Sequence, residues 1–146
     1  MHSITLRFVA ASGTPSASDL IQGGAVLLWV DEAGLACARA WAHCACVTVF
    51  MGSASFLRPV RCGDLVEVEA RMAYTGSSSM SMAVEVRAGS IQDRDLQPVT
   101  HCVVVYAAVD DDGQPRAVDA WTPETPGDIA LAQRVKAHID AARAAQ

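Results

Sequence analysis

One segment of this sequence is apolar on nearly every side when it is read as a helix. From residue 24 to about residue 41, turn-forming residues disappear and apolar residues recur at three- and four-residue steps. The recurring stripe is Val26, Val30, Ala33, Cys37 and Trp41. Leucines and alanines cover most of the remaining surface. Because a helix that is apolar all round must be buried on more than one side, the sequence predicts a long central helix enclosed by other elements.

The segments around this helix have the alternating pattern of β-strands. One strand is predicted before the helix and four after it, at residues 3–10, 46–56, 65–74, 80–87 and 99–109. In the segment 46–56, alternation places Thr48 and Phe50 on one face and Val47, Val49 and Met51 on the other. Short turns join the later strands, which is typical of antiparallel neighbours.

A second helix is predicted at the C-terminal end, at about 125–144. Thr125 is a suitable N-cap and Pro126 a suitable first helical residue. The apolar stripe expected for this helix is Ile129, Ala132, Val135 and Ile139. The whole chain, 1–146, is therefore predicted to be a single α+β domain, with a five-stranded antiparallel sheet wrapped around the central helix. Such a sheet leaves edges and one helix face uncovered, so we expect a homodimer.

Composition excludes several classes of protein. The chain has 16 acidic against 11 basic residues and a net charge of −5, without the basic stripe that a nucleic-acid partner would require. Its longest nearly apolar run, 23–30, is too short to cross a membrane, and the N-terminus lacks the pattern of a signal peptide. An odd number of cysteines, 5, without such a signal suits a reducing compartment. We therefore expect a cytoplasmic protein.

Asp31 lies near the middle of the predicted apolar helix, with Leu27 and Leu28 one turn before it and Leu35 one turn after. An unpaired carboxylate in such a place costs several kcal/mol, roughly, so it must be paired, neutralised or used. One interpretation is a carboxylate at the helix edge that is solvated or paired with Arg39. The other is a general base or nucleophile.

The pair Gly23-Gly24 opens the same helix. One interpretation is a tight turn into the helix. The other is a carbonyl-binding site, in which exposed N–H groups and the positive end of the helix dipole polarise the carbonyl. Asp31 follows Gly24 by seven residues, which is about 10 Å of α-helix and too far for both to act on one carbonyl. If both act in one site, the carboxylate must come from a second subunit across a two-fold interface.

Other candidate sites are weaker. His43, Cys44 and Cys46 are clustered but lack the paired spacing of a zinc site, and His101 lies in an apolar strand. The sequence has no nucleophile-elbow, P-loop or dinucleotide-binding motif. We therefore expect no metal and no cofactor.

A set of motifs spaced along nearly the whole chain resembles a known family. The motifs are Gly23-Gly24, Asp31-Glu32-Ala33, Val47-Thr48-Val49, Ser55-Phe56-Leu57-Arg58-Pro59-Val60 with Gly63-Asp64, Gly76 with Ser78-Ser79-Met80, Val109-Asp110 with Asp112-Gly113, Pro115-Arg116 and Pro123-Glu124-Thr125. Together they are similar to those of the hotdog-fold acyl-CoA thioesterases, in particular the bacterial YciA-like branch. The resemblance implies a hotdog fold and hydrolysis of acyl-CoA to CoA and a free carboxylic acid. It also implies a homodimer that assembles into a hexamer of three dimers, or into a tetramer.

The resemblance further implies roles for individual residues. Asp31 would be the base or nucleophile, the N–H of Gly24 would hold the thioester carbonyl, and the Thr48 hydroxyl would help to place the water. Ser16 stands where the family usually has an Asn that orients the carbonyl. The CoA part of the substrate, which is not a separate cofactor, would contact Gly23, Arg58, Gly76, Ser77, Ser78 and Ser79.

The chain departs from the family pattern at several positions. Besides Ser16, it has Asp19 for a usual Gly, Gln22 for Phe, Gly52 for an acid and Ser77 for Arg or Lys. These departures keep an alternative open: a non-catalytic hotdog module that binds acyl-CoA without hydrolysing it. A hotdog hydratase is a third candidate, but it generally needs a His near the helix, and neither the helix nor its preceding loop contains one.

Overall fold

The computed structural model describes residues 2–11, 19–52 and 54–145. Over these residues the order of elements is the predicted one: strand, helix, four strands, helix. The elements are β1 (Ser3–Val9), α1 (Gly23–Ala42), β2 (Cys46–Gly52), β3 (Leu65–Thr75), β4 (Ser79–Gly89), β5 (Gln97–Ala108) and α2 (Pro126–Ala144). The predicted second strand was too long, because β2 ends at Gly52 rather than at residue 56.

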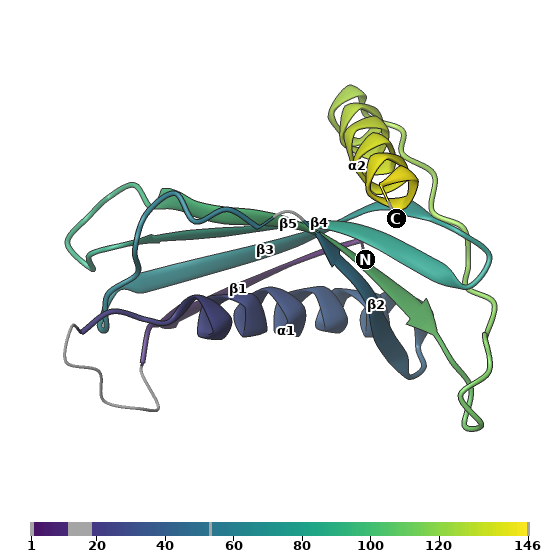
Figure 1. Cartoon of the computed structure of the whole chain (residues 1–146), viewed down its shortest axis with the longest axis horizontal. Helices are drawn as coiled ribbons and strands as arrows, with labels where there is room; N and C mark the ends of the chain where they lie inside the picture. The colour runs from purple at the N-terminus through teal and green to yellow at the C-terminus, as the bar shows by residue number, and fades with distance from the viewer. Residues whose placement is uncertain (1, 12–18, 53, 146) are drawn as a thin grey trace.

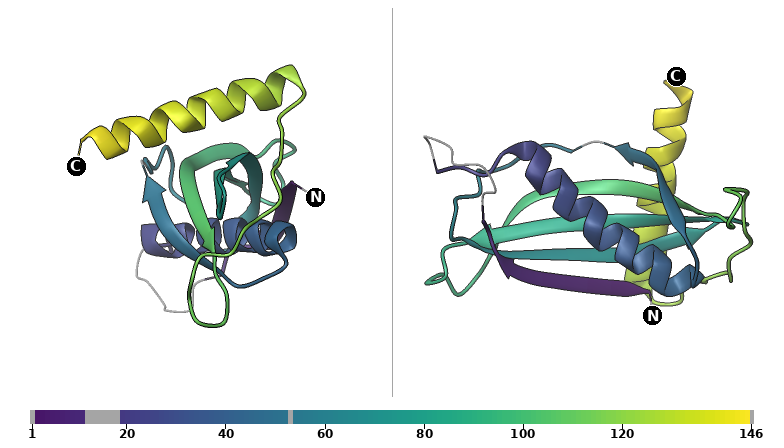
Figure 2. Two further views of the ribbon diagram at one scale, coloured as in Figure 1. Left: turned by 90° about the vertical axis from the view of Figure 1, so that its right-hand side faces the viewer. Right: turned by 90° about the horizontal axis from the view of Figure 1, so that it is seen from below.

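The strands form one antiparallel sheet in the order β1-β3-β4-β5-β2, so β1 and β2 are its edges. Helix α1 lies along one face and contacts all five strands (Figure 1). Helix α2 crosses the opposite face and packs on β3, β4 and β5, so that the sheet lies between the two helices (Figure 2). The predicted five-stranded antiparallel sheet around a long central helix, with a C-terminal helix added, is confirmed.

The main core lies between α1 and the inner face of the sheet. Four of the five residues predicted for the buried helix stripe, Val26, Val30, Ala33 and Cys37, are at most 2% exposed. Trp41 is half-buried at the end of the helix, where its indole N–H donates to the Asp119 carbonyl at 2.8 Å. The helix is nevertheless not covered on every side by its own chain, since Leu28 is 56% exposed.

The predicted stripe of helix α2 is partly confirmed: Val135 and Ile139 are buried, but Ile129 is not, and Leu131 takes its place. Its buried residues are Leu131, Val135 and Ile139, whereas Ile129 is 41% exposed. The four-residue spacing of the observed stripe places all three side chains toward the sheet, where they join Ala73 and Val105 in a small second core. The predicted N-cap is confirmed, because the Thr125 hydroxyl accepts a hydrogen bond from the Asp128 amide at 3.1 Å.

A bulge in β2 corrects the predicted alternation of that strand. Thr48 pairs with Tyr106 and Phe50 pairs with Val105, so the register shifts by one residue at Val49. Thr48 and Phe50 were expected on one face, but the extra residue sends them to opposite faces. Phe50 packs in the small core under α2, and Thr48 is directed toward α1.

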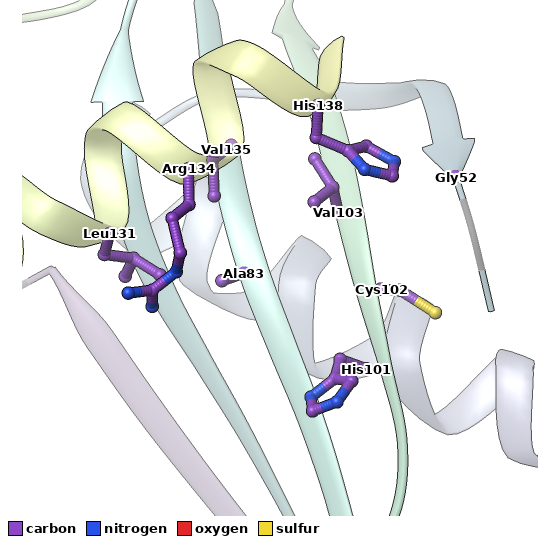
Figure 3. A pocket seen from close by; sticks show the side chains of 9 residues that line it. All are labelled: Gly52, Ala83, His101, Cys102, Val103, Leu131, Arg134, Val135 and His138. Carbon is purple, nitrogen blue, oxygen red and sulfur yellow. The ribbon is translucent and has the colours of Figure 1, made fainter. Parts of the chain in front are cut away.

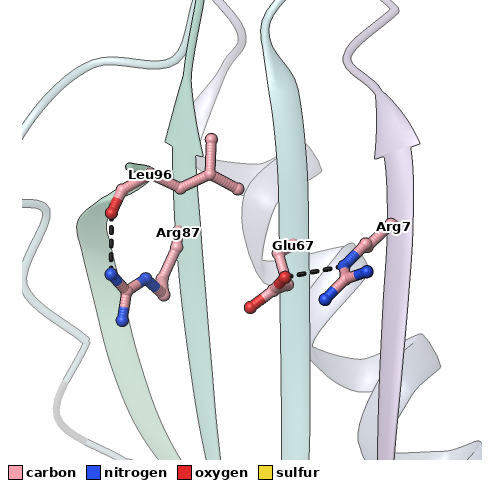
Figure 4. A network of polar contacts seen from close by, with 4 residues as sticks. All are labelled: Arg7, Glu67, Arg87 and Leu96. Carbon is pink, nitrogen blue, oxygen red and sulfur yellow. Dashed lines mark hydrogen bonds and ion pairs between the residues drawn. The ribbon is translucent and has the colours of Figure 1, made fainter. Parts of the chain in front are cut away.

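The part of the outer sheet face beyond α2 is polar. Arg7, Glu67 and Arg87 are neighbours across three strands. The Arg7 Nε donates to Glu67 Oε2 at 2.7 Å, and an Arg87 guanidinium nitrogen donates to the Leu96 carbonyl at 2.8 Å (Figure 4). Because Arg7 is 70% exposed, its ion pair with Glu67 contributes little to stability.

Candidate active site

The carboxylate of Asp31 is held by two hydroxyl groups from the sheet. Its Oδ1 accepts one hydrogen bond from Thr48 Oγ1 at 2.8 Å and another from the Tyr106 hydroxyl at 3.0 Å. The Tyr106 hydroxyl also lies 3.2 Å from the Asp31 carbonyl oxygen. The predicted alternative, pairing with Arg39, is wrong: among the described residues no ion pair reaches Asp31.

The sheet register explains why these two hydroxyls meet. Thr48 of β2 and Tyr106 of β5 are direct partners across the two antiparallel strands, so their side chains project from the same face, toward α1. Tyr106 is fully buried. Its ring crosses α1 at Gly34, one turn after Asp31, where an added Cβ would lie 2.8 Å from ring atoms Cε2 and Cζ. A residue without a side chain is therefore required at Gly34 for the tyrosine to reach Asp31.

The local electrostatics keep Tyr106 as a proton donor. Burial, and after it the neighbouring Asp31 carboxylate, raise the pKa of the Tyr106 hydroxyl far above its ordinary value. Both donors converge on Oδ1, and within the described parts of the chain Oδ2 accepts no hydrogen bond. Asp31 is half-buried rather than enclosed, so one carboxylate oxygen is available to a water molecule or a substrate.

At the start of α1, two backbone N–H groups have no acceptor among the residues that the structure describes. The helix begins at Gly23, as expected, and its N-cap residue Gln22 makes no side-chain capping bond. The amides of Ala25 and Val26 donate to the Gln22 carbonyl, whereas those of Gly23 and Gly24 find no acceptor among the residues described. A Cβ added at Gly24 would meet no atom of the described residues within 4 Å. These amides, with the helix dipole, form a suitable site for a carbonyl oxygen.

A pocket of about 410 Å³ begins at this helix start. It brings together two residues predicted to bind CoA, Gly23 and Arg58. Its other lining residues are mostly apolar: Ile21, Val26, Phe56, Leu57, Pro59, Val60 and Val99. The Arg58 side chain is anchored there, because its Nε donates to the Pro98 carbonyl at 3.0 Å.

The remaining predicted CoA residues lie elsewhere in the chain. Gly76, Ser77 and Ser78 form the turn between β3 and β4, and Ser79 begins β4. The turn is closed by the Gly76 amide, which donates to the Ser79 carbonyl at 2.9 Å. This turn and the Arg58 pocket lie at opposite ends of β3, a strand of 11 residues and so about 35 Å long. Within one chain they cannot contact the same part of a ligand. Ser16 lies outside the described residues.

Asp31 borders an apolar surface that the chain leaves uncovered. Leu28, one turn before it on α1, is 56% exposed, and Val47 and Val49 of β2 are 46% and 56% exposed. Strand β2 pairs only with β5 among the strands described, so its other edge is free. An exposed strand edge beside exposed large apolar side chains is typical of a surface that another chain covers.

A second pocket, of about 460 Å³, lies on the other side of the sheet under α2. His101 of β5 and Arg134 and His138 of α2 line it (Figure 3). Because the sheet separates this pocket from α1, it is not part of the Asp31 site. His101 is therefore an exposed residue of this outer pocket.

The residues considered and disfavoured as a zinc site, His43, Cys44 and Cys46, lie at the junction of α1 and β2. His43 caps the C-terminal end of α1 in a left-handed conformation, φ 56°, and Cys46 is buried at the start of β2. Burial raises the pKa of the Cys46 thiol to about 11. In the described ranges no group of three or more His, Cys, Asp or Glu side chains could hold a metal ion. Nor is any helix there long and apolar enough to span a membrane.

Tyr106 is the site residue that the sequence interpretation missed. It lies in a β-branched run that reads only as a buried strand, and its partner Asp31 is 75 residues away. Gly34 was a usable signal, since a glycine inside an otherwise good helix often marks a close approach by another group.

Comparisons with known proteins give a consistent result. The family model described as the Thioesterase superfamily matches residues 20–93. The acyl-CoA thioester hydrolase YciA of Salmonella typhimurium is 34% identical over 116 residues, which are 77% of this chain and 87% of that protein. A solved hexameric acyl-CoA thioesterase is 25% identical with a TM-score of 0.86, covering 94% of this chain and 88% of that one. The hexameric thioesterase of Yersinia pestis is 34% identical with a TM-score of 0.74, covering 78% of this chain and 94% of its own.

Proposed function

The chain belongs to the Thioesterase superfamily, and we propose that it hydrolyses acyl-CoA thioesters to CoA and free carboxylic acids. Relatives that bear the name acyl-CoA thioester hydrolase support the substrate class. The observation that carries the proposal is the Asp31 carboxylate, which is fixed through Oδ1 by Thr48 and Tyr106 and keeps Oδ2 free beside an uncovered apolar surface.

In the proposed reaction Asp31 is the general base. Its Oδ2 takes a proton from a water molecule while the water oxygen forms a bond to the thioester carbon. The carbonyl oxygen becomes an oxyanion, which the N–H of Gly24 and the helix dipole stabilise. The carbon–sulfur bond then breaks, the carboxylic acid is released, and the CoA sulfur receives the proton that Asp31 had taken. In the variant in which Asp31 acts as nucleophile, its carboxylate oxygen bonds to the thioester carbon and the carbon–sulfur bond breaks. Water then hydrolyses the mixed anhydride, which restores Asp31, releases the carboxylic acid and supplies the proton of the CoA thiol.

The proposed site contains residues of two chains. Along one helix, Gly24 and Asp31 are separated by about 10 Å, so a thioester between them requires the helix start of a partner chain. The free edge of β2 and the exposed side chains of Leu28, Val47 and Val49 supply a surface for that partner. We propose a homodimer in which each Asp31 faces the partner's helix start.

A higher assembly of dimers would bring the CoA residues together. Arg58 and the turn at 76–79 are too far apart in one chain, so they contact one CoA molecule only if they come from different chains. Relatives described as hexameric support three dimers per assembly, rather than the tetramer that the sequence also left open.

The test is an Asp31→Asn variant assayed on acyl-CoAs from acetyl to palmitoyl by release of free thiol. We expect kcat to fall by about 100-fold or more, because a general base contributes about 10²–10⁴ to a rate. Glu32→Gln is the matched control: it removes the adjacent, exposed carboxylate of the same helix and should leave kcat within about twofold. Activity of Asp31→Asn within a few-fold of wild type would contradict the proposed role.

The alternative function is a module that binds acyl-CoA without hydrolysing it. The substitutions at Ser16 and Gln22 motivate this alternative. A binding module has no need for a buried tyrosine and a threonine that fix one carboxylate oxygen, so the geometry favours hydrolysis. Micromolar binding of acyl-CoA by calorimetry, without thiol release by the wild-type chain, would support the alternative.

A further inference from the structure

Tyr106 makes an unusual contact for a residue of the main core. Its side chain is fully buried between α1 and the sheet, where an apolar ring such as Phe would fill the same volume without a polar atom. The hydroxyl nevertheless reaches the functional carboxylate, at 3.0 Å from Asp31 Oδ1. The question is what this hydroxyl adds to a site that already has the Thr48 hydroxyl.

Two features of the structure allow Tyr106 to contact Asp31. Tyr106 sits in β5 between β4 and β2, paired with Met80 on one side and Thr48 on the other, so its backbone is fixed from both sides. On the helix, Gly34 provides the space, since any side chain there would overlap the Tyr106 ring. A helix-interior glycine is less favourable than alanine by about 0.5–1 kcal/mol. The helix therefore gives up some stability at Gly34, where the glycine leaves room for the Tyr106 ring.

We propose that Tyr106 is a positioning residue for Asp31: together with Thr48 it fixes Oδ1, so that Oδ2 alone is presented to the reacting water. This inference rests on the proposed function and extends it. Two donors on one oxygen fix the rotation of the carboxylate, which a single donor would leave free to turn and exchange its oxygens. The raised pKa of the Tyr106 hydroxyl means that it remains a donor throughout the pH range in which a thioesterase works.

The first test removes the hydroxyl alone. Tyr106→Phe should lower kcat by about tenfold or more, with KM changed by less than about twofold, because a hydrogen bond to a charged group is lost away from the substrate-binding surface. Tyr74→Phe is the matched control, since Tyr74 is the other of the chain's two tyrosines and packs in the small core under α2. It should leave both constants unchanged.

The second test separates positioning from a general effect on the fold. In an Asp31→Asn background, adding Tyr106→Phe should lower the residual rate no further, because the carboxylate on which Tyr106 acts is absent. If Tyr106→Phe lowers the rate by the same factor in both backgrounds, its role is structural and the inference is wrong. A folded Tyr106→Phe enzyme with wild-type kcat would overturn it equally.

A separate variant covers the case in which Tyr106→Phe does not fold. Gly34→Ala displaces the Tyr106 ring while retaining its hydroxyl, and should also lower kcat with little change in KM. Unchanged kcat in a folded Gly34→Ala enzyme would count against the inference. The proposed function is tested independently: if Asp31→Asn is inactive but these variants are fully active, only the positioning role fails.

Discussion

Gly34 is the position where one added methyl group should disturb both the fold and the site. A Cβ on residue 34 would lie 2.8 Å from two ring carbons of Tyr106 and closer still to its hydroxyl oxygen. Ordinary carbon–carbon contacts are about 3.5–4.0 Å, so the ring or the helix must move by about 1 Å. Tyr106 is fully buried, and neighbouring strands pair with it on both sides, so neither partner can move freely.

The expected magnitude is the difference of opposing effects. Alanine in a helix interior gains about 0.5–1 kcal/mol over glycine. Overpacking a well-packed core costs about 1–3 kcal/mol, and a weakened hydrogen bond to a charged group costs about 1.5–3 kcal/mol at most. These terms sum to about 0–5 kcal/mol, so we expect Gly34→Ala to lower the free energy of unfolding by about 2–3 kcal/mol, the middle of that range, and to lower kcat.

The assay is urea denaturation at one fixed protein concentration, together with steady-state kinetics on the same preparation. Gly127→Ala is the matched control, because a Cβ at this position of α2 meets no atom within 4 Å. It should be neutral or slightly stabilising. If Gly34→Ala proves as stable and as active as Gly127→Ala, then the Tyr106 ring does not lie against this glycine, and the reasoning is refuted.

Three further perturbations test other parts of the account. Val49→Lys places a charge on the exposed edge strand and should shift the chain toward the monomer in size-exclusion chromatography, with loss of thioesterase activity; an unchanged oligomer would exclude this edge as the interface. Burial raises the pKa of the Cys37 and Cys46 thiols to about 11, so between about pH 9 and 11 these thiols lose their protons in the unfolded chain but keep them in the folded one. The melting temperature should therefore fall over that range, and the fall should be smaller in Cys37→Ala. Thr125→Ala removes the N-cap of α2 and should cost about 1 kcal/mol in urea denaturation with kcat unchanged; no loss would mean that the cap does not stabilise the helix.

Much of the fold could be predicted because its strongest signals are local. The near-continuous apolar character of α1 requires a covering layer, and the alternation of the later strands supplies a sheet to form it. Thr125, Pro126 and Asp128 define the start of α2 without reference to any other element. The stripe of α2 was less predictable, because Ile129 and Leu131 are equally apolar, and only the position of the sheet decides which one is buried.

Within the candidate site, Thr48 was expected from the family resemblance, and the other predicted residues were recognisable because each conflicts with its own surroundings. Asp31 was identifiable because a carboxylate is out of place in an apolar helix, and Gly24 because it opens that helix. Tyr106 was not, since a tyrosine is ordinary in a strand and its contact depends on the register between β2 and β5. The bulge at Val49 directs Thr48 and Phe50 to opposite faces, and no local preference in the sequence reveals it.

The most direct test of a site shared between two chains is complementation between inactive variants. Asp31→Asn removes the base, and Gly24→Pro removes one backbone donor in the first helical turn, where proline is tolerated; an added Cβ at Gly24 meets no atom of the described residues within 4 Å. Each variant alone should retain about 1% of wild-type activity or less. When the two are refolded together, half of the dimers are mixed and each mixed dimer has one intact site, so about one quarter of wild-type activity should return. If the mixture remains as inactive as its components, the base and the helix start act within a single chain, and the central claim is wrong.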